Sequence, residues 1–122
     1  MQTLVTFVFK FLAALPLAWL HKLGNLLGSL GFRVLSKDRR RVFENMKLAG
    51  LNPTDEAVKK VFRETAKGGL ELPVAFFRRP EEIENLFVSV NGWEHVQTAL
   101  SAGEGLLFIT PHIGSYDLAG RY

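Results

Sequence analysis

The fold is decided by residues 105–117, which read GLLFITPHIGSYD. The apolar first half has the length and composition of a buried β-strand, and a Thr-Pro pair ends it. His112 comes directly after this pair, and Asp117 follows five residues later, where a helix is able to begin at Ser115. Because catalytic groups favour strand ends of this kind, we interpret His112 as a general base and Asp117 as the carboxylate that orients it.

The chemistry of such a pair is direct. A carboxylate bonded to one ring nitrogen fixes the tautomer and stabilises the imidazolium that forms when the other nitrogen takes a proton from a hydroxyl. Backbone N–H groups near Gly114 and Ser115 are then placed to bind a phosphate or a developing oxyanion. The H-x4-D spacing alone is a weak signal, and a strand-end histidine with Asp117 as a helix cap is the structural alternative.

The residues before this stretch indicate an α/β fold. Residues 86–90 have the composition of a strand, residues 93–102 that of a helix, and residues 106–110 that of a second strand. Two strands joined through a helix form a βαβ unit, whose strands are usually parallel. The sequence therefore predicts a parallel sheet that carries His112 at its edge.

Two further helices are predicted in the middle of the chain. Ser36 is a candidate N-cap for a helix over residues 36–48, and acidic residues favour a helix start at Asp55. The second helix weakens at Gly68-Gly69 and resumes to residue 77. It ends at Arg78 and Arg79, which we expect to be solvated, with binding of an acyl donor as the alternative. The helix over residues 36–48 carries a basic cluster that suits either a solvated face or anionic lipid headgroups: Lys37, Arg39, Arg40 and Arg41.

Residues 1–32 predict an apolar helical membrane anchor, with the rest of the chain, 33–122, as a second unit. No acidic residue precedes Asp38. Charged residues interrupt every window long enough for a simple span, and Pro16 is expected to bend the helix. At helical spacing, one face is mostly small or polar and is expected to face protein or water: Thr3, Lys10, Ala14, Leu17, His21, Gly24 and Gly28. The alternative is a buried helix of a soluble core.

Composition excludes several classes of function. The chain of 122 residues has a net charge of +3 and no Cys, which removes disulfides, thiolate nucleophiles and cysteine metal sites. The three His residues lie in unrelated segments, so no metal site is predicted, and no cofactor or nucleic-acid module is recognised. Without Cys or a G-x-S-x-G motif, direct transfer is favoured over a covalent acyl-enzyme.

Taken together, these motifs resemble the bacterial lipid A biosynthesis (lauroyl/myristoyl) acyltransferases, within the glycerolipid acyltransferase superfamily. The resemblance rests on the order of an apolar start, Arg40-Arg41-Val42, the run 92–96 (GWEHV) and the run 103–114 (GEGLLFITPHIG). Where the family often has Asn-Trp-Glu after the glycine, this chain has residues 115–117 (SYD), so a carboxylate is kept at the same place.

The resemblance implies a fold, a reaction and a location. The fold would be the N-terminal part of an αβα sandwich of the glycerolipid acyltransferase type, preceded by the anchor. The reaction would be transfer of a fatty acyl group from acyl carrier protein to a hydroxyl of a Kdo-bearing lipid A precursor, at the cytoplasmic face of the inner membrane. His112 would deprotonate that hydroxyl, and Asp117 would orient His112.

Family members continue for more than a hundred residues beyond the point that corresponds to Tyr122, so the resemblance also implies an N-terminal fragment. Two other functions stay open. One is an acyltransferase of the same superfamily that acts on a glycerophospholipid or a phosphatidylinositol mannoside. The other is an inactive membrane-bound fragment in which the His112–Asp117 pair is a relic.

Overall fold

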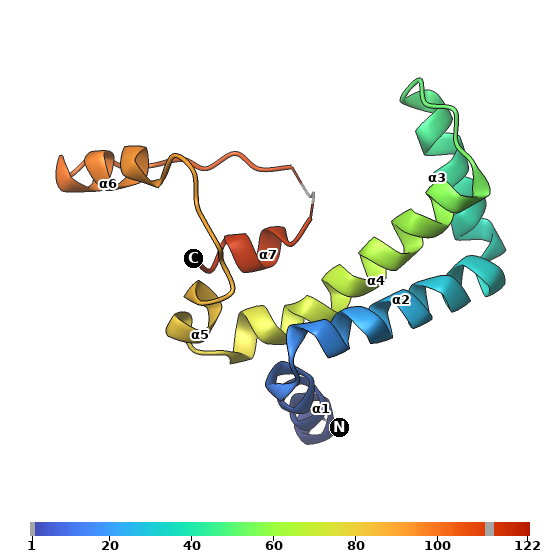
Figure 1. The fold of residues 1–122 in the computed structure, drawn as a ribbon, viewed down its shortest axis with the longest axis horizontal. Coiled ribbons are helices and arrows are strands. Elements are labelled where there is room, and N and C mark those ends of the chain that lie inside the picture. The colour runs from blue at the N-terminus through green and yellow to red at the C-terminus, as the bar shows by residue number, and fades with distance from the viewer. Residues whose placement is uncertain (1, 112–113) are drawn as a thin grey trace.

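The computed structural model describes residues 2–111 and 114–122, and within these ranges it contains helices and no strand. The helices follow one another along the chain (Figure 1). Their bounds are α1 (Gln2–Ala14), α2 (Leu17–Val34), α3 (Ser36–Leu48), α4 (Asp55–Phe77), α5 (Pro80–Glu84), α6 (Trp93–Ser101) and α7 (Tyr116–Ala119).

The predicted α/β class is therefore wrong for the described residues. The expected strands at 86–90 and 106–110 form no sheet, and the sandwich is not found. Residues 106–109 are exposed along their whole length, with Leu107 at 87% and Ile109 at 90%. An apolar run becomes a strand only when a neighbouring segment completes its hydrogen-bond ladder, and no described segment does so here.

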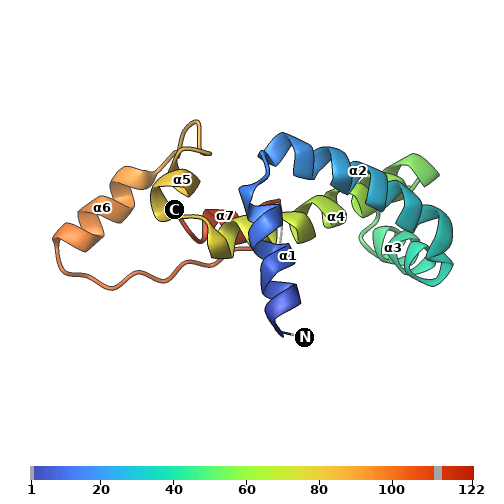
Figure 2. The ribbon, with the colours of Figure 1, turned by 90° about the horizontal axis from the view of Figure 1, so that it is seen from below.

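The apolar anchor helix predicted for residues 1–32 is also wrong. The segment is divided between α1 and α2, and the bend between them is 116° (Figure 2). Pro16 causes the break as expected, because it has no N–H to continue the helix and its backbone is extended (φ −55°, ψ 138°). Among the described helices none is long and apolar enough by itself to cross a membrane; only the bent pair, from Thr3 to Val34, reaches that length and composition.

The helices predicted from their start signals are confirmed. Helix α3 spans the predicted residues, but Ser36 is its first residue and Leu35 its N-cap, so the prediction of Ser36 as N-cap is wrong, and no side chain caps the first turn. Helix α4 begins after Thr54, whose hydroxyl accepts a hydrogen bond from the Ala57 N–H at 3.2 Å. It continues without a break through Gly68-Gly69 and past the buried Pro73. Since a proline has no N–H for the carbonyl four residues earlier, α4 lacks one hydrogen bond at Gly69.

The closest contact in the structure is the antiparallel packing of α2 against α4. A Cβ added at Gly24 would lie 2.9 Å from the Cα of Lys67, and one added at Gly28 would lie 2.4 Å from the Cα of Arg63. Higher numbers on α2 thus meet lower numbers on α4, and the two helices run side by side in Figure 1. Only glycine permits this approach, so the predicted small face of residues 21–28 does face protein.

A polar pair joins the same two helices. His21 of α2 and Glu71 of α4 are bonded through Nε2 and Oε1 at 2.6 Å. The Glu71 side chain is 5% exposed and that of His21 is 38% exposed. The sequence places His21 on the helix face expected to meet protein or water. The structure shows that this face meets α4, where His21 bonds a buried carboxylate that would otherwise be costly to bury.

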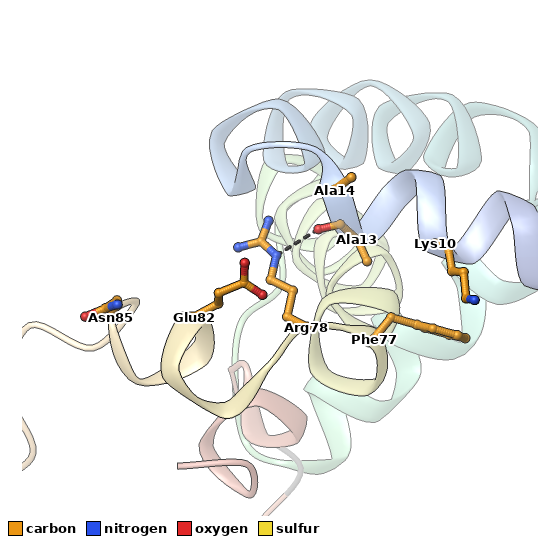
Figure 3. A pocket seen from close by; sticks show the side chains of 7 residues that line it. All are labelled: Lys10, Ala13, Ala14, Phe77, Arg78, Glu82 and Asn85. Carbon is orange, nitrogen blue, oxygen red and sulfur yellow. Dashed lines mark hydrogen bonds between the residues drawn. The ribbon is translucent and has the colours of Figure 1, made fainter.

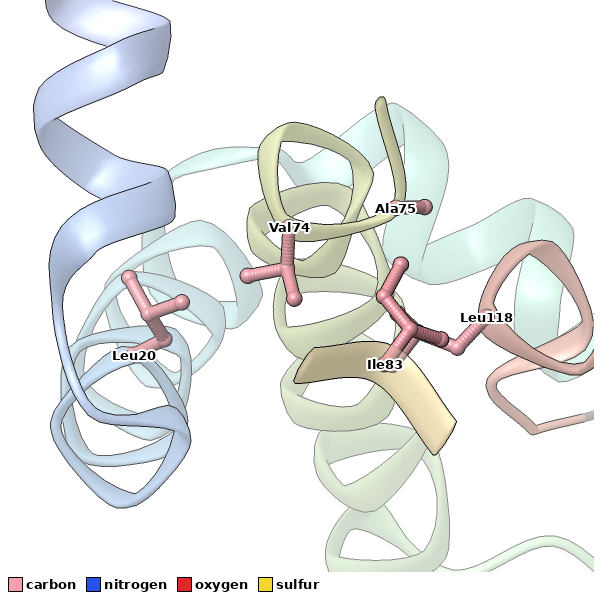
Figure 4. Close-up of a cluster of buried hydrophobic side chains, with 5 residues drawn as sticks. All are labelled: Leu20, Val74, Ala75, Ile83 and Leu118. Carbon is pink, nitrogen blue, oxygen red and sulfur yellow. The ribbon is translucent and has the colours of Figure 1, made fainter. Parts of the chain in front are cut away.

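A second contact holds the C-terminal helix in place. Leu20 and Val74 face each other across α2 and α4, and on the other side of α4 Ala75 meets Ile83 of α5 and Leu118 of α7 (Figure 4). All five side chains are buried. Because α7 has only four residues, this apolar contact rather than its own hydrogen bonds fixes its position.

Helix α6 lies away from the α2–α4 pair in both views (Figures 1 and 2), and no residue of it is buried. Its start is tied to the chain end by aromatic rings. The Tyr122 ring lies 4.9 Å from the Phe87 ring and 4.9 Å from the Trp93 ring, in edge-to-face arrangements.

The glycine contact leads to a first prediction. We expect Gly28→Ala to lower the free energy of unfolding by about 1–3 kcal/mol, because the added methyl meets helix backbone that cannot move aside. Gly68→Ala is the matched control: a Cβ there meets no atom within 4 Å. It should raise stability by about 0.5–1 kcal/mol through helix propensity. Urea unfolding followed by circular dichroism would measure both, and equal stabilities would contradict the packing.

The buried carboxylate leads to a second prediction. His21→Ala should lower the free energy of unfolding by about 1–3 kcal/mol, because Glu71 stays buried without its partner. Glu71→Gln should cost less, since an amide oxygen still accepts a hydrogen bond from the imidazole. Thermal unfolding of the two variants beside the wild type would rank them. An H21A midpoint equal to that of the wild type would show that Glu71 does not depend on His21.

Candidate functional site

Asp117 lies in the first turn of α7, half-buried, and its neighbour Leu118 is anchored in the core. The helix start predicted at Ser115 is confirmed as the N-cap position, although the Ser115 side chain makes no capping hydrogen bond. Gly114 has φ +65°, a left-handed conformation that favours glycine over other residues. The packing of Leu118 therefore determines where the Asp117 carboxylate is held.

His112 lies outside the described residues, as does Ile113. The predicted contact between His112 and Asp117 thus stays a prediction. The described neighbours on either side are exposed, at Pro111 and at Gly114.

A groove of about 800 Å³ lies between α4 and residues 114–117. We call it the α4–α7 groove and define it by Val61, Gly68, Gly69, Leu72 and Asp117 among the residues that line it. Its volume is within the usual range for small-molecule sites. The groove thus places the predicted carboxylate and both predicted substrate-binding residues, Gly114 and Ser115, on one cavity wall.

Lys67, Glu64 and Glu71 of the groove wall are bonded within the protein, and Lys60, which also lines the groove, is exposed. Lys67 Nζ lies 2.9 Å from Glu64 Oε1. Glu71, which also lines the groove, is bonded to His21. Both pairs lie on or against α4, about one helical turn apart. Within each pair the charge of one side chain is offset by its partner.

A second cavity, of about 580 Å³, lies where α1 meets the end of α4 (Figure 3). Arg78 is its central residue. Its Nε donates to the Ala13 carbonyl at 2.8 Å and its Nη2 to the Leu15 carbonyl at 2.6 Å. These are carbonyls that the end of α1 leaves without helical partners, so Arg78 caps α1. The expectation that it is solvated is wrong.

At this second cavity, the charge of Glu82 is offset by Arg79, three residues earlier in the chain. The Arg79 backbone N–H donates to Glu82 at 3.1 Å, and this bond, assisted by the Arg79 guanidinium, lowers the pKa of the Glu82 carboxyl. Arg79 itself is exposed, as expected. None of the predicted catalytic or substrate-binding residues that the structure describes lines this cavity, so we regard the α4–α7 groove as the candidate site.

The basic cluster of α3 is separate from the groove. Arg40 donates to Glu44 at 2.7 Å, which raises the pKa of Arg40, and Arg41 lies 3.4 Å from Asp38. The Arg39 guanidinium lies over the Phe32 ring at 5.2 Å from its centre. Lys37 is exposed. Intrahelical pairs therefore offset part of the positive charge, and among the described groove-lining residues α3 supplies only Met46.

Sequence reasoning missed three features of this region: the His21–Glu71 bond, the Arg78 cap and the open glycine wall. The first was signalled by the shared helical face of His21, Gly24 and Gly28. The others depend on contacts between distant segments, which no local pattern encodes. In the part of the chain that the structure describes, no three His, Asp or Glu side chains gather closely enough to hold a metal ion.

Comparison with known proteins gives one match. The model of a family described as bacterial lipid A biosynthesis acyltransferase matches residues 1–122. No curated protein and no solved structure matches the chain.

Proposed function

Because the chain belongs to the bacterial lipid A biosynthesis acyltransferase family, we propose that it transfers a fatty acyl group from acyl carrier protein to a hydroxyl of a Kdo-bearing lipid A precursor. The family match over the whole chain carries this proposal. It agrees with the resemblance seen in the residues themselves, and it includes the H-x4-D motif of residues 112–117.

In the proposed mechanism His112 is the general base. Its imidazole takes the proton of the acceptor hydroxyl, and the oxygen attacks the carbonyl carbon of the acyl thioester. The tetrahedral intermediate collapses with cleavage of the C–S bond, and the leaving thiolate takes the proton back from the imidazolium. Asp117 orients His112 and stabilises its charged form. Backbone N–H groups at Gly114 and Ser115 are proposed to bind the substrate oxygen.

The arrangement of the described residues supports the role of Asp117. Its helix is fixed by Leu118, and its carboxylate lies at a groove large enough for a substrate. A catalytic group needs both a fixed position and space for the reacting atoms beside it.

We further propose that the protein works at the cytoplasmic face of the inner membrane. Large apolar side chains on α1 and α2 face outward, including Phe7 at 68% exposed, Trp19 at 65% and Leu26 at 67%. The small residues of α2 face α4 instead, so its apolar face is the outer one. Basic residues of α3 provide charge that suits anionic headgroups: Lys37, Arg39, Arg40 and Arg41.

The reaction leads to a third prediction. In the protein expressed from its entire coding sequence, His112→Ala should reduce acyl transfer by about 10²–10⁴-fold, the usual contribution of a general base. Asp117→Asn should also reduce it, because an amide does not stabilise the imidazolium. His95→Ala, on the exposed face of α6, is the control and should retain activity.

The assay uses acyl carrier protein charged with radiolabelled acyl groups, offered in parallel to a lipid A precursor, a glycerophospholipid and a phosphatidylinositol mannoside. Thermal unfolding verifies that each variant is folded. Full activity in the His112 variant would refute the assigned base. Transfer only to one of the other two acceptors would reassign the substrate.

The location leads to a fourth prediction. Leu26→Asp and Leu30→Asp should each weaken flotation with vesicles of phosphatidylethanolamine and phosphatidylglycerol by several-fold, because a charge replaces apolar surface at the lipid boundary. Leu100→Asp on α6 is the matched control, since Leu100 is 60% exposed on a different helix. Unchanged flotation of both α2 variants would contradict the proposed contact with the membrane.

A further inference from the structure

Helix α5 is a short element with a single buried side chain. Of its five residues only Ile83 is buried. A helix of this length is not stable through its own hydrogen bonds. Two arginines before it determine its position instead: Arg78 donates to carbonyls at the end of α1, and the Arg79 backbone N–H and guanidinium both donate to Glu82. These bonds fix the place at which Ile83 enters the core.

The segment that begins with Ile83 packs against the C-terminal end of the chain at two points. Ile83 is fully buried, belongs to the same cluster as Leu118 of α7, and points toward it beside α4 (Figure 4). Just after α5, Phe87 packs against this cluster, and its ring lies 4.9 Å from the Tyr122 ring. One contact is thus made within α7 and the other beyond its last residue.

Together these contacts fix the rotation of α7 as well as its position. Successive side chains of a helix point about 100° apart, so the direction of Leu118 determines that of Asp117. With Leu118 in the core, Asp117 is half-buried and lines the α4–α7 groove. Leu118 alone would leave a four-residue helix free to pivot about one side chain. The contact at Tyr122 opposes that pivot, because it lies beyond the end of the helix.

We propose that Ile83 and Phe87 are positioning residues for the acyl transfer, which hold α7 so that the Asp117 carboxylate keeps the orientation needed to bond His112. We call these two side chains the α5 clamp. The inference rests on the proposed function, in which Asp117 orients the base. Neither clamp residue is among the described residues that line the groove, so the clamp acts on the reaction through α7.

The α5 clamp should affect turnover more than substrate binding. A carboxylate that orients a general base acts mainly in the transition state, where it stabilises the imidazolium. A displacement of about 1 Å at a catalytic group is able to lower a rate by about 10²-fold. Loosening the clamp should therefore lower kcat and leave KM nearly unchanged.

Kinetics of matched core variants test the inference in the protein expressed from its entire coding sequence. Ile83→Ala should lower kcat roughly 10–100-fold and change KM by less than about twofold. Leu20→Ala is the matched control: Leu20 is as buried as Ile83 and belongs to the same cluster, but it lies on the α2 side of α4. It removes the same number of carbons, and its kcat should stay within about threefold of the wild type. Thermal unfolding verifies that both variants are folded.

Amide hydrogen exchange reports on α7 without any catalysis. Backbone amides at the end of α7 donate to carbonyls at its start, so their exchange measures how often the helix opens. Ile83→Ala should accelerate exchange in the peptide of residues 114–122 by about tenfold or more relative to Leu20→Ala. Phe87→Ala should accelerate it as well, because the ring contact with the chain end is lost.

The two measurements separate the α5 clamp from the proposed function. Equal kcat values in folded Ile83→Ala and Leu20→Ala would overturn the proposal, and so would unchanged exchange of residues 114–122 in Ile83→Ala. If Ile83→Ala does not fold, Ile83→Val decides by the same readouts, with values between those of the wild type and Leu20→Ala on one side and a loosened α7 on the other. A wild-type protein without acyl transfer would refute the proposed function instead, whatever the exchange of α7.

Discussion

The contact between the glycines of α2 and the backbone of α4 is the constraint on which the rest of the structure depends. Gly24 and Gly28 let the two helices approach until any larger residue would overlap α4. That approach brings Leu20 against Val74 and His21 against Glu71. It therefore fixes α4, and α4 in turn carries both the surface on which α7 packs and the wall of the groove.

The same contact determines what the protein presents outward. A helix of a soluble protein usually turns its apolar face inward. Helix α2 instead turns Leu20 and its small residues inward, because close approach of the backbones needs the small residues. Most of its large apolar side chains are left exposed: Trp19, Leu23, Leu26, Leu27 and Leu30. The bend at Pro16 extends this apolar surface onto α1, and Arg78 stabilises the bend by donating to the Ala13 and Leu15 carbonyls on its N-terminal side. Packing within the protein and apolar exposure outside are thus two results of one sequence pattern.

Sequence patterns predicted the helices well wherever the signal was local. Ser36 and Asp55 mark the two helix starts locally, and the structure confirms the bounds of α3 and α4, although Leu35 is the N-cap of α3 and no side chain caps its first turn. The spacing of His21, Gly24 and Gly28 identified the face that packs. The predicted strands are not found. An apolar run such as residues 106–109 forms a strand only when a neighbouring segment pairs with it, and no described segment does so. The prediction for Arg78 was wrong for a similar reason: the carbonyls to which it donates lie more than sixty positions away along the chain.

For the candidate site, the sequence identified the Asp117 position but not what surrounds it. The half-buried carboxylate stays beside the groove because Leu118 is held by Ala75 and Ile83, so the site depends on the core through one adjacent residue. Since α7 has only four residues, its own hydrogen bonds do not fix that position. A change that separates α2 from α4 therefore moves the surface under Leu118 and the carboxylate with it. The position of the Asp117 carboxylate therefore depends on the close fit of Gly24 and Gly28 of α2 against the backbone of α4.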